Sequence, residues 1–224
     1  MISGFRLQRC GMLKKRSWQA YSLTELAIVL GVMGVVLASI WATASAAWES
    51  SRREQTLEIV TTIANNIHAS NYPSLSFALG GVDYYVPLFF KQGIIPNSVQ
   101  RRATSGCSNN SGLCADTPWG IGGSNGSLQV CPWNYGTSTP PCATAASTGT
   151  VQFFAIQLSS LSQANCIQLA SMISGAPTLT GLLQVYINST IGTASTLTVA
   201  DAKTNCAAGN ANVLGMVFRL NVSY

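Results

Sequence analysis

Side chains able to carry out catalysis are scarce in this chain. His68 is the only histidine, so any Ser–His–Asp arrangement would need it, yet it lies in a segment with helical periodicity. No GxSxG, P-loop or HExxH pattern occurs, and beyond Glu58 the only acidic residues are Asp83, Asp116 and Asp201. General acid–base or metal chemistry has almost no groups to use. We therefore expect no enzyme activity, no catalytic residues, no metal site and no cofactor.

The reactive side chains that occur in number are cysteines. Six of the seven lie beyond residue 100, in sequence rich in Gly, Ser, Thr and Asn. An even number in such a region predicts disulfides and an oxidising compartment. The alternatives are unpaired core cysteines or a zinc site, but no CxxC pair occurs. Many connectivities are possible, and the simplest local pairs are Cys107 with Cys114 and Cys131 with Cys142. The other two of the six are Cys166 and Cys206.

Composition points away from an ordinary soluble domain. Hydrophobic residues make up 47% of the chain and charged residues only 8%, against about 25% charged residues in a typical soluble protein. The formal charge is +5, but five basic residues precede residue 20, and the other seven balance seven acidic residues. No basic patch remains for nucleic acid. We therefore expect a chain that enters a membrane or associates with other subunits, and that binds no nucleic acid directly.

The elements that must position these residues begin with an apolar segment near the N-terminus. Leu26–Trp48 carries no charge and no proline, and as a helix it is long enough to span a bilayer. The basic residues before it should stay cytoplasmic. The rest of the chain then faces the periplasm or the outside, which agrees with the cysteines.

The helix should continue beyond the apolar segment. From Glu49 the pattern turns amphipathic, and Val60, Ile63 and Ile67 recur at helical spacing up to a stop at Asn71-Tyr72-Pro73. We predict one helix from about Ser22 to Ser70, roughly 75 Å long. A domain of this size cannot bury such a helix along its whole length. Its first half must protrude and needs lipid or other subunits around it.

The start of this segment carries a family resemblance. Lys14–Ala20 is basic and ends in a small residue, Tyr21-Ser22-Leu23-Thr24-Glu25 follows, and the apolar segment comes next. This order resembles the class III signal of type IV pilins, in which a prepilin peptidase cuts before the apolar run and the new N-terminus is methylated. The resemblance implies a cut between Ala20 and Tyr21 and methylation of Tyr21. The family usually has Gly before the cut, where this chain has Ala20.

Glu25 is then the fifth residue of the mature chain. A carboxylate at the apolar level of a bilayer is costly unless it meets a cation. The resemblance implies that this cation is the α-amine of Tyr21 on a neighbouring subunit, so that Glu25 sets the axial register during assembly. The alternative is an ordinary acidic residue near a helix N-terminus, favoured by the helix dipole.

Motifs in the second half extend the resemblance to the type IVb subgroup. Pro118-Trp119-Gly120 resembles a Trp–Gly turn of that subgroup, with a core Trp beside a turn as the alternative. Gln157–Met172 reads as a strand, a Ser-capped turn and a helix carrying Cys166. It looks like the start of the type IVb D-region, which implies a Cys166–Cys206 disulfide. Further strands are expected at Ser127–Val130, Gln152–Ile156, Leu182–Asn188, Thr196–Val199 and Val213–Val222.

These features together predict an α+β fold of the type IV pilin kind. A long protruding N-terminal helix would pack on a mainly antiparallel sheet, with a disulfide-stabilised C-terminal region. We expect a leader at residues 1–20 that is removed, a helix at 21–70 whose part 21–48 is the membrane and filament core, and a globular head at 71–224. The D-region would lie at about 166–206.

The expected function is that of a structural subunit, the major pilin of a type IVb pilus. It would polymerise with itself into a surface filament for adhesion, aggregation or conjugative mating contact. Its expected partners are the prepilin peptidase, the inner-membrane assembly platform and an ATPase. It would reside in the inner membrane before assembly and in the extracellular pilus afterwards. The alternatives are a minor pilin or type II secretion pseudopilin, and a signal-anchored periplasmic binding domain.

Overall fold

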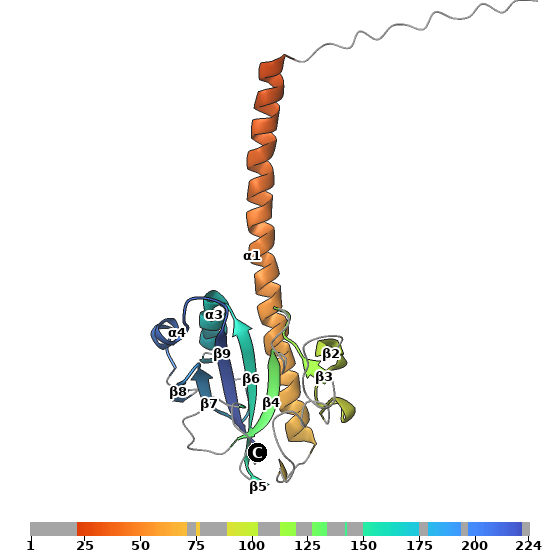
Figure 1. Ribbon diagram of the computed structural model, residues 1–224, viewed down its shortest axis with the longest axis vertical. Helices are drawn as coiled ribbons and strands as arrows, with labels where there is room; N and C mark the ends of the chain where they lie inside the picture. Colours follow the sequence, from red (N-terminus) through yellow and green to blue (C-terminus); the bar gives the residue numbers. More distant parts are fainter. Residues whose placement is uncertain are drawn as a thin grey trace, which may run out of the picture. The chain divides into compact units, whose positions relative to one another are not determined.

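The structure, a computed structural model, describes most of the chain beyond its N-terminal segment. The described residues are 22–70, 75–76, 89–102, 113–119, 127–133, 142, 150–174, 179–193 and 197–220. The chain divides into two compact units, Met1–Ala47 and Trp48–Tyr224. In the described part, the first unit is helical throughout from Leu23, and the second unit holds all the strands (Figure 1).

Helix α1, Leu23–Ala69, is the longest element. Its ends lie within one residue of the predicted helix at 22–70. Pro73 follows soon after its end in the sequence, where helical backbone is disfavoured. Within the second unit the helix buries a single stripe of side chains at intervals of three and four residues, as expected for a helix with one face on a core. The buried residues are Thr56, Val60, Ile63, Ala64 and Ile67.

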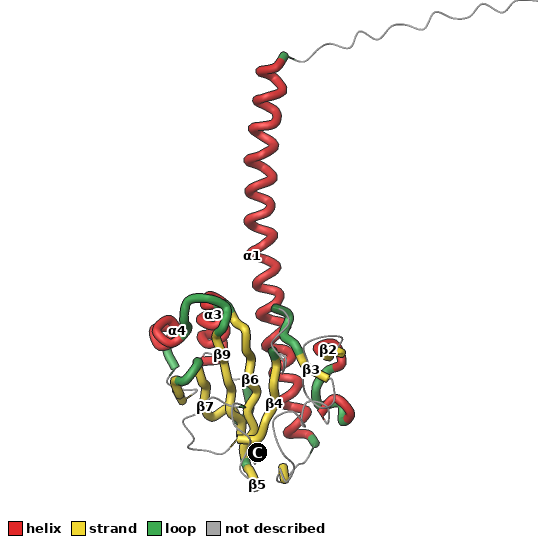
Figure 2. The backbone as a smooth tube through the Cα atoms, viewed as in Figure 1, coloured by secondary structure: helices red, strands yellow, loops and turns green. Residues whose placement is uncertain are grey.

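A seven-stranded sheet forms the centre of the second unit (Figure 2). The strand order is β2-β3-β4-β6-β9-β7-β8, and each neighbouring pair is antiparallel. A separate small sheet pairs β1 with β5. The α+β class with a mainly antiparallel sheet, predicted from sequence, is thereby confirmed. The strands are β1 Leu75–Ser76, β2 Gln100–Arg102, β3 Leu113–Ala115, β4 Leu128–Trp133, β5 Thr150–Val151, β6 Phe153–Leu161, β7 Leu182–Ile187, β8 Thr190–Thr193 and β9 Asn212–Arg219, with a short 3-10 turn η2 at Asn97–Val99.

The main core lies between the second half of α1 and one face of the sheet. Alternate residues of β6 point into it, namely Phe154, Ile156 and Leu158, and all three are buried. Phe154 stacks on Phe218 of β9, with ring centroids 5.1 Å apart. Because β6 lies between β4 and β9, its inward side chains occupy the centre of the core rather than an edge.

The opposite face of the sheet carries a second, smaller cluster. Cys131, Ala155 and Val217 are neighbours across β4, β6 and β9, and all are buried. The indole of Trp133 meets the ring of Tyr186 edge-on, with centroids 5.1 Å apart. The central strands are thus covered on both faces, which explains why Phe153–Ile156 reads as a continuous apolar run rather than an alternating one.

Two helices complete the C-terminal part, α3 at Gln163–Ser174 and α4 at Val199–Asn205. Helix α3 packs on β9 and β7, and α4 packs on α3. Ser162 caps α3, because its Oγ accepts a hydrogen bond of 3.2 Å from the N–H of Asn165. The predicted strand, Ser-capped turn and helix therefore occur in that order. The strand continues to Leu161 through an irregularity between Leu158 and Leu161, and Ser160 has a φ of 60°.

The strand predicted at Thr196–Val199 is wrong. Thr196 lies outside the described residues, while Thr198 is the N-cap of α4 and Val199 its first residue. The Oγ1 of Thr198 accepts from the N–H of Asp201 at 3.2 Å, and Asp201 Oδ2 accepts from the N–H of Thr198 at 2.9 Å. This capping box stabilises a helix start, and its local hydrogen bonds outweigh the strand preference of Thr and Val. The edge strand beside β7 is β8, which comes earlier in the chain than the predicted strand.

Candidate functional site

The feature of the first unit that most needs explanation is its uncovered apolar surface. From Leu23 to Ala47 every residue of α1 is exposed, and the large apolar side chains include Ile28 at 66%, Leu37 at 66% and Trp41 at 79%. The helix is long and apolar enough to cross a membrane, with a mean hydropathy of 2.3 over its most apolar 18 residues. A helix that is apolar all round is stable in water only when something covers it. This surface is therefore a candidate site for lipid or for other subunits.

The N-terminal end of this surface is a capped helix start. The Ser22 Oγ accepts a hydrogen bond from the N–H of Glu25 at 3.2 Å, and the Ser22 carbonyl accepts from the N–H of Leu26 at 3.1 Å. Ser22 is therefore the N-cap, and Glu25 occupies the first turn, where the helix dipole favours a negative charge. Ala20 and Tyr21 lie outside the described residues. The predicted cleavage, methylation and pairing of Glu25 with the Tyr21 amine stay predictions.

Four side chains form a small cluster in the second unit where α1 enters the fold; we call it the collar, and it consists of Trp48, Glu49, Arg52 and Trp119. The indole N–H of Trp119 donates to Glu49 Oε2 at 3.0 Å. The other carboxylate oxygen of Glu49 lies 4.0 Å from Arg52 Nη1. The guanidinium of Arg52 sits 5.4 Å from the centre of the Trp48 ring. One carboxylate thus links α1 to the residue that follows Pro118.

Trp119 has one of the two roles that the sequence left open, and the other stays a prediction. It is partly buried and packs against the main core, so it is a core Trp beside a turn. Gly120, the other residue of the predicted Trp–Gly turn, lies outside the described residues. The hydrogen bond to Glu49 was not predicted, because the two residues are 70 positions apart and no local pattern relates them.

The described residues of the second unit include two disulfides. Cys166 of α3 bonds to Cys206, the C-cap of α4, with Cα atoms 6.0 Å apart. Cys131 of β4 bonds to Cys142, with Cα atoms 5.5 Å apart. The first closes a separation of 40 residues and so constrains the unfolded chain more than the second, which closes 11. Cys107 and the side chain of Cys114 lie outside the described part, so their pairing stays a prediction.

A buried asparagine network supports the Cys166–Cys206 bond. Asn212 is 1% exposed, and its Nδ2 donates to the carbonyls of Leu161 at 3.1 Å and Ala207 at 2.9 Å. Its Oδ1 accepts from the Nδ2 of Asn188 at 3.1 Å, and Asn188 also donates to the Asn205 carbonyl at 2.7 Å. Asn188 has a φ of 55°, a conformation that Asn tolerates better than most residues. The network joins the ends of β6, β7, α4 and β9.

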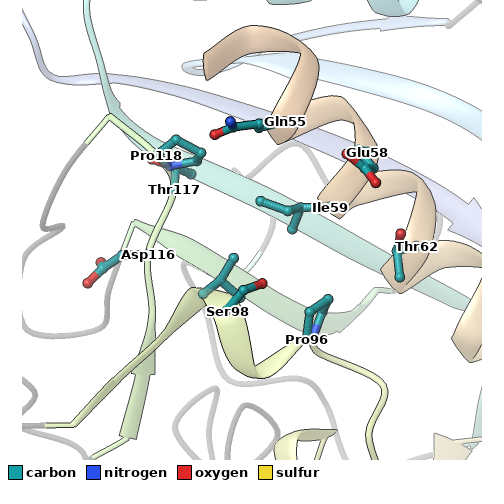
Figure 3. A pocket seen from close by; sticks show the side chains of 10 residues that line it. Gln55, Glu58, Ile59, Thr62, Pro96, Ser98, Asp116, Thr117 and Pro118 are labelled. Atoms are coloured by element: carbon teal, nitrogen blue, oxygen red, sulfur yellow. The ribbon is translucent and has the colours of Figure 1, made fainter. Parts of the chain in front are cut away.

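An open groove of about 690 Å³ runs beside α1 (Figure 3). One wall comes from α1 and the other from η2 and the residues after β3. Glu58 and Asp116 supply its carboxylates, and Asp116 is already engaged, because its Oδ1 accepts from the N–H of Ser127 at 2.9 Å. The lining residues are Gln55, Glu58, Ile59, Thr62, Pro96, Ser98, Val99, Asp116, Thr117 and Pro118.

His68 makes contacts that hold the end of α1 against the sheet. One ring nitrogen, Nε2, lies 2.8 Å from the carbonyl oxygen of Arg219, which can only accept, so this nitrogen donates. The ring also meets Phe154 edge-on, with centroids 5.7 Å apart. Among the described residues, no group of three or more His, Cys, Asp or Glu side chains is placed to hold a metal ion.

A long N-terminal helix packed on an antiparallel sheet, with two disulfides in the C-terminal half, defines the type IV pilin fold. The protein-family model described as PilS N terminal matches residues 87–218, more than half of the chain. The chain belongs to the PilS family. The resemblance to type IVb pilins found in the sequence is thereby confirmed.

Solved structures and curated proteins were also compared. The crystal structure of type IV b pilin from Salmonella typhi is similar, with a TM-score of 0.49 and 18% sequence identity. The match covers 71% of this chain and 95% of that chain. No curated protein matches.

Proposed function

We propose that this chain is the major subunit of a type IVb pilus, a structural protein without catalytic activity. The observation that carries the proposal is the uncovered apolar half of α1. In a bilayer its side chains would contact lipid tails, and in a filament they would contact the same surface on neighbouring subunits. A helix covered by neither would leave a large apolar area in water, at a cost of about 25 cal/mol per Å².

Processing would release the helix for assembly. In this proposal the prepilin peptidase removes residues 1–20, and Tyr21 becomes the methylated N-terminus. Glu25 then meets the α-amine of Tyr21 on the neighbouring subunit, and this ion pair sets the axial register. An inner-membrane platform and an ATPase would move subunits from the membrane into the filament. The filament would act in adhesion, aggregation or mating contact.

The leader and the register role have separate tests. Intact-mass measurement of the chain extracted from membranes should show the loss of residues 1–20 and the gain of one methyl group. Retention of residues 1–20 would contradict the processing step and favour a signal-anchored periplasmic domain.

The register role is tested with Glu25→Val, which removes the carboxylate and keeps the segment apolar. Cleavage should survive, while filaments counted by electron microscopy should be lost. Glu54→Val is the matched control, because Glu54 is also exposed on α1 but lies beyond the apolar segment. Normal filaments from Glu25→Val would contradict the register role.

Stoichiometry decides between a major and a minor subunit. Quantitative mass spectrometry of purified filaments should find this chain as the most abundant pilin. If a different pilin dominates and this chain is present in only a few copies, it is a minor pilin or a pseudopilin instead.

A further inference from the structure

The collar lies where α1 changes from exposed to buried. Trp48 is the last residue of the uncharged stretch that begins at Leu26. Its indole is still 64% exposed, whereas Thr56, two turns later, is 1% exposed. The side chains between them supply the first charges after Glu25, and they include Glu49 and Arg52. Here an exposed indole lies beside an arginine at the end of a long apolar stretch. This combination fits a boundary between an apolar and a polar medium.

In the described part of the chain, the collar is attached to the folded domain through Trp119. Trp119 packs against the main core and donates its indole N–H to Glu49. This hydrogen bond fixes Glu49, and Glu49 holds Arg52 through a contact of 4.0 Å, the outer limit for an ion pair. A guanidinium has five N–H donors, and one contact at that distance leaves donors free for a stronger acceptor. The indole of Trp48, covered by Arg52 on one face, stays exposed.

These side chains have the chemistry of a membrane–water interface. Indole rings gather at the headgroup level because one part of the ring is apolar and its N–H is polar. A guanidinium matches a phosphate with two parallel hydrogen bonds. The uncharged stretch Leu26–Trp48 is roughly 34 Å long as a helix, close to the ~30 Å hydrocarbon core of a bilayer. When Glu25 lies at one headgroup level, Trp48 and Arg52 therefore lie at the other.

We propose that Trp48 and Arg52 form a phospholipid headgroup site that sets the depth of the membrane-inserted subunit. Arg52 binds the phosphate of a lipid, and the Trp48 indole lies in the interfacial layer beside it. The site rests on the proposed function in one respect, namely that α1 is in a membrane before assembly. It adds a lipid ligand and two binding residues, and it explains why the collar leaves the Trp48 ring exposed beside a partly exposed cation.

The depth of each indole can be measured on the full chain. The protein, labelled with 5-fluorotryptophan, is placed in vesicles of phosphatidylethanolamine and phosphatidylglycerol, and the signals of its five tryptophans are assigned with single Trp→Phe variants. Paramagnetic lipids then carry the label either at the headgroup or in the middle of the acyl chain. The Trp48 signal should be broadened several times more by the headgroup label. Trp41, about 10 Å further along the helix, should show the opposite preference.

Arg52 is tested in the same vesicles with Arg52→Gln. The Trp48 signal should lose its preference for the headgroup label, and Arg53→Gln, which removes the neighbouring charge, should leave it unchanged. In vesicles of a galactosyl diacylglycerol, which has no phosphate, the wild type and Arg52→Gln should behave alike. If the two proteins differ equally in both kinds of vesicle, phosphate is not the ligand.

The outcomes separate this inference from the proposed function. A chain that does not float with the vesicles contradicts membrane insertion and with it the proposed function. A chain that floats, but whose Trp48 responds like Trp41 or only to a water-soluble relaxation agent, overturns the headgroup site alone. A Trp48 signal broadened by neither lipid label but protected from that agent would mean that a second copy of the chain covers the collar, which also overturns the site.

Discussion

The two parts of α1 carry similar side chains in opposite surroundings. Leu30, in the first unit, is 61% exposed, and Ile63, in the second unit, is fully buried. Both belong to one uninterrupted helix. In the second part the apolar residues form a stripe that the sheet covers, so folding of the chain itself explains them. In the first part no such stripe exists, and only an environment outside this chain can explain the residues.

Two glycines in the first part of α1 show the same difference between its two parts. Among the described residues, a side chain added at Gly31 or Gly34 would meet nothing within 4 Å, so no contact there requires a glycine. Each nevertheless costs the helix about 1 kcal/mol relative to alanine. One helix therefore contains a part that stabilises the fold and a part whose composition is explained only by lipid or other subunits outside this chain. Substitutions in the second part should change the free energy of unfolding, and those in the first part should leave it unchanged.

The largest effect should come from the Cys166–Cys206 disulfide, which belongs entirely to the second unit. A Cys166→Ser/Cys206→Ser double variant should lower the free energy of unfolding by about 4 kcal/mol, because the unfolded chain regains a loop of this length. Denaturant unfolding in detergent measures this loss. The amount of protein retained in membranes should stay unchanged, since α1 is untouched.

The shorter disulfide is the matched control. A Cys131→Ser/Cys142→Ser variant should lose less, about 3 kcal/mol in the same chain-entropy account. A fall in membrane retention in either variant would show that the apolar part of α1 depends on the fold of the second unit, against the contrast described above.

A matched pair on α1 tests the contrast directly. Ile63→Ala should lower the free energy of unfolding by about 3.5 kcal/mol, because it leaves a cavity in the main core. Leu30→Ala should leave that free energy unchanged, since Leu30 is 61% exposed in the described part of the chain. Denaturant unfolding of both variants gives the comparison, and an equal loss in the two would contradict it.

The smallest effect concerns the cap of α4 at acid pH. Hydrogen bonds from the side chain and backbone of Thr198 hold the pKa of Asp201 below its ordinary value of 3.8. A carboxyl group with a lowered pKa in the folded state adds stability above its unfolded pKa, and this is lost as the pH falls through the folded pKa. Below about pH 4 the Thr198 and Asp201 amides should therefore lose protection against hydrogen exchange, measured by NMR relative to the rate expected for unfolded chain at the same pH. Asp201→Asn should abolish this pH dependence, while amides of α1 stay unaffected in both proteins.

The sequence predicted the elements whose signal is local. The absence of charge from Leu26 to Trp48 and the spacing of Val60, Ile63 and Ile67 were enough to locate α1 to within one residue at each end. The position of Cys166 on a helix after a serine cap was also predictable, because a cap and a helical period involve only neighbouring residues.

The features that could not be predicted from the sequence are hydrogen bonds between segments far apart in the chain. No sequence pattern relates Glu49 to Trp119, which are 70 positions apart. The collar could therefore be found only from the folded structure. The Asn188–Asn212 bond joins residues 24 positions apart in a region where asparagine is common. The wrong strand at Thr196–Val199 had a different cause, since a capping box competed there with β-branched residues and prevailed.

The asparagine network also affects how the protein ages chemically. Spontaneous deamidation of an asparagine requires the backbone nitrogen of the next residue to attack the side-chain amide carbon. For Asn212 that nitrogen belongs to Val213, and its N–H is held by the Oδ1 of Asn188 at 2.9 Å. Deamidation would also place an oxygen where the Asn212 amide now donates to the carbonyls of Leu161 and Ala207. The bonds that join four elements of the fold thus keep the attacking nitrogen of this asparagine occupied, so Asn212 should deamidate more slowly than an exposed asparagine.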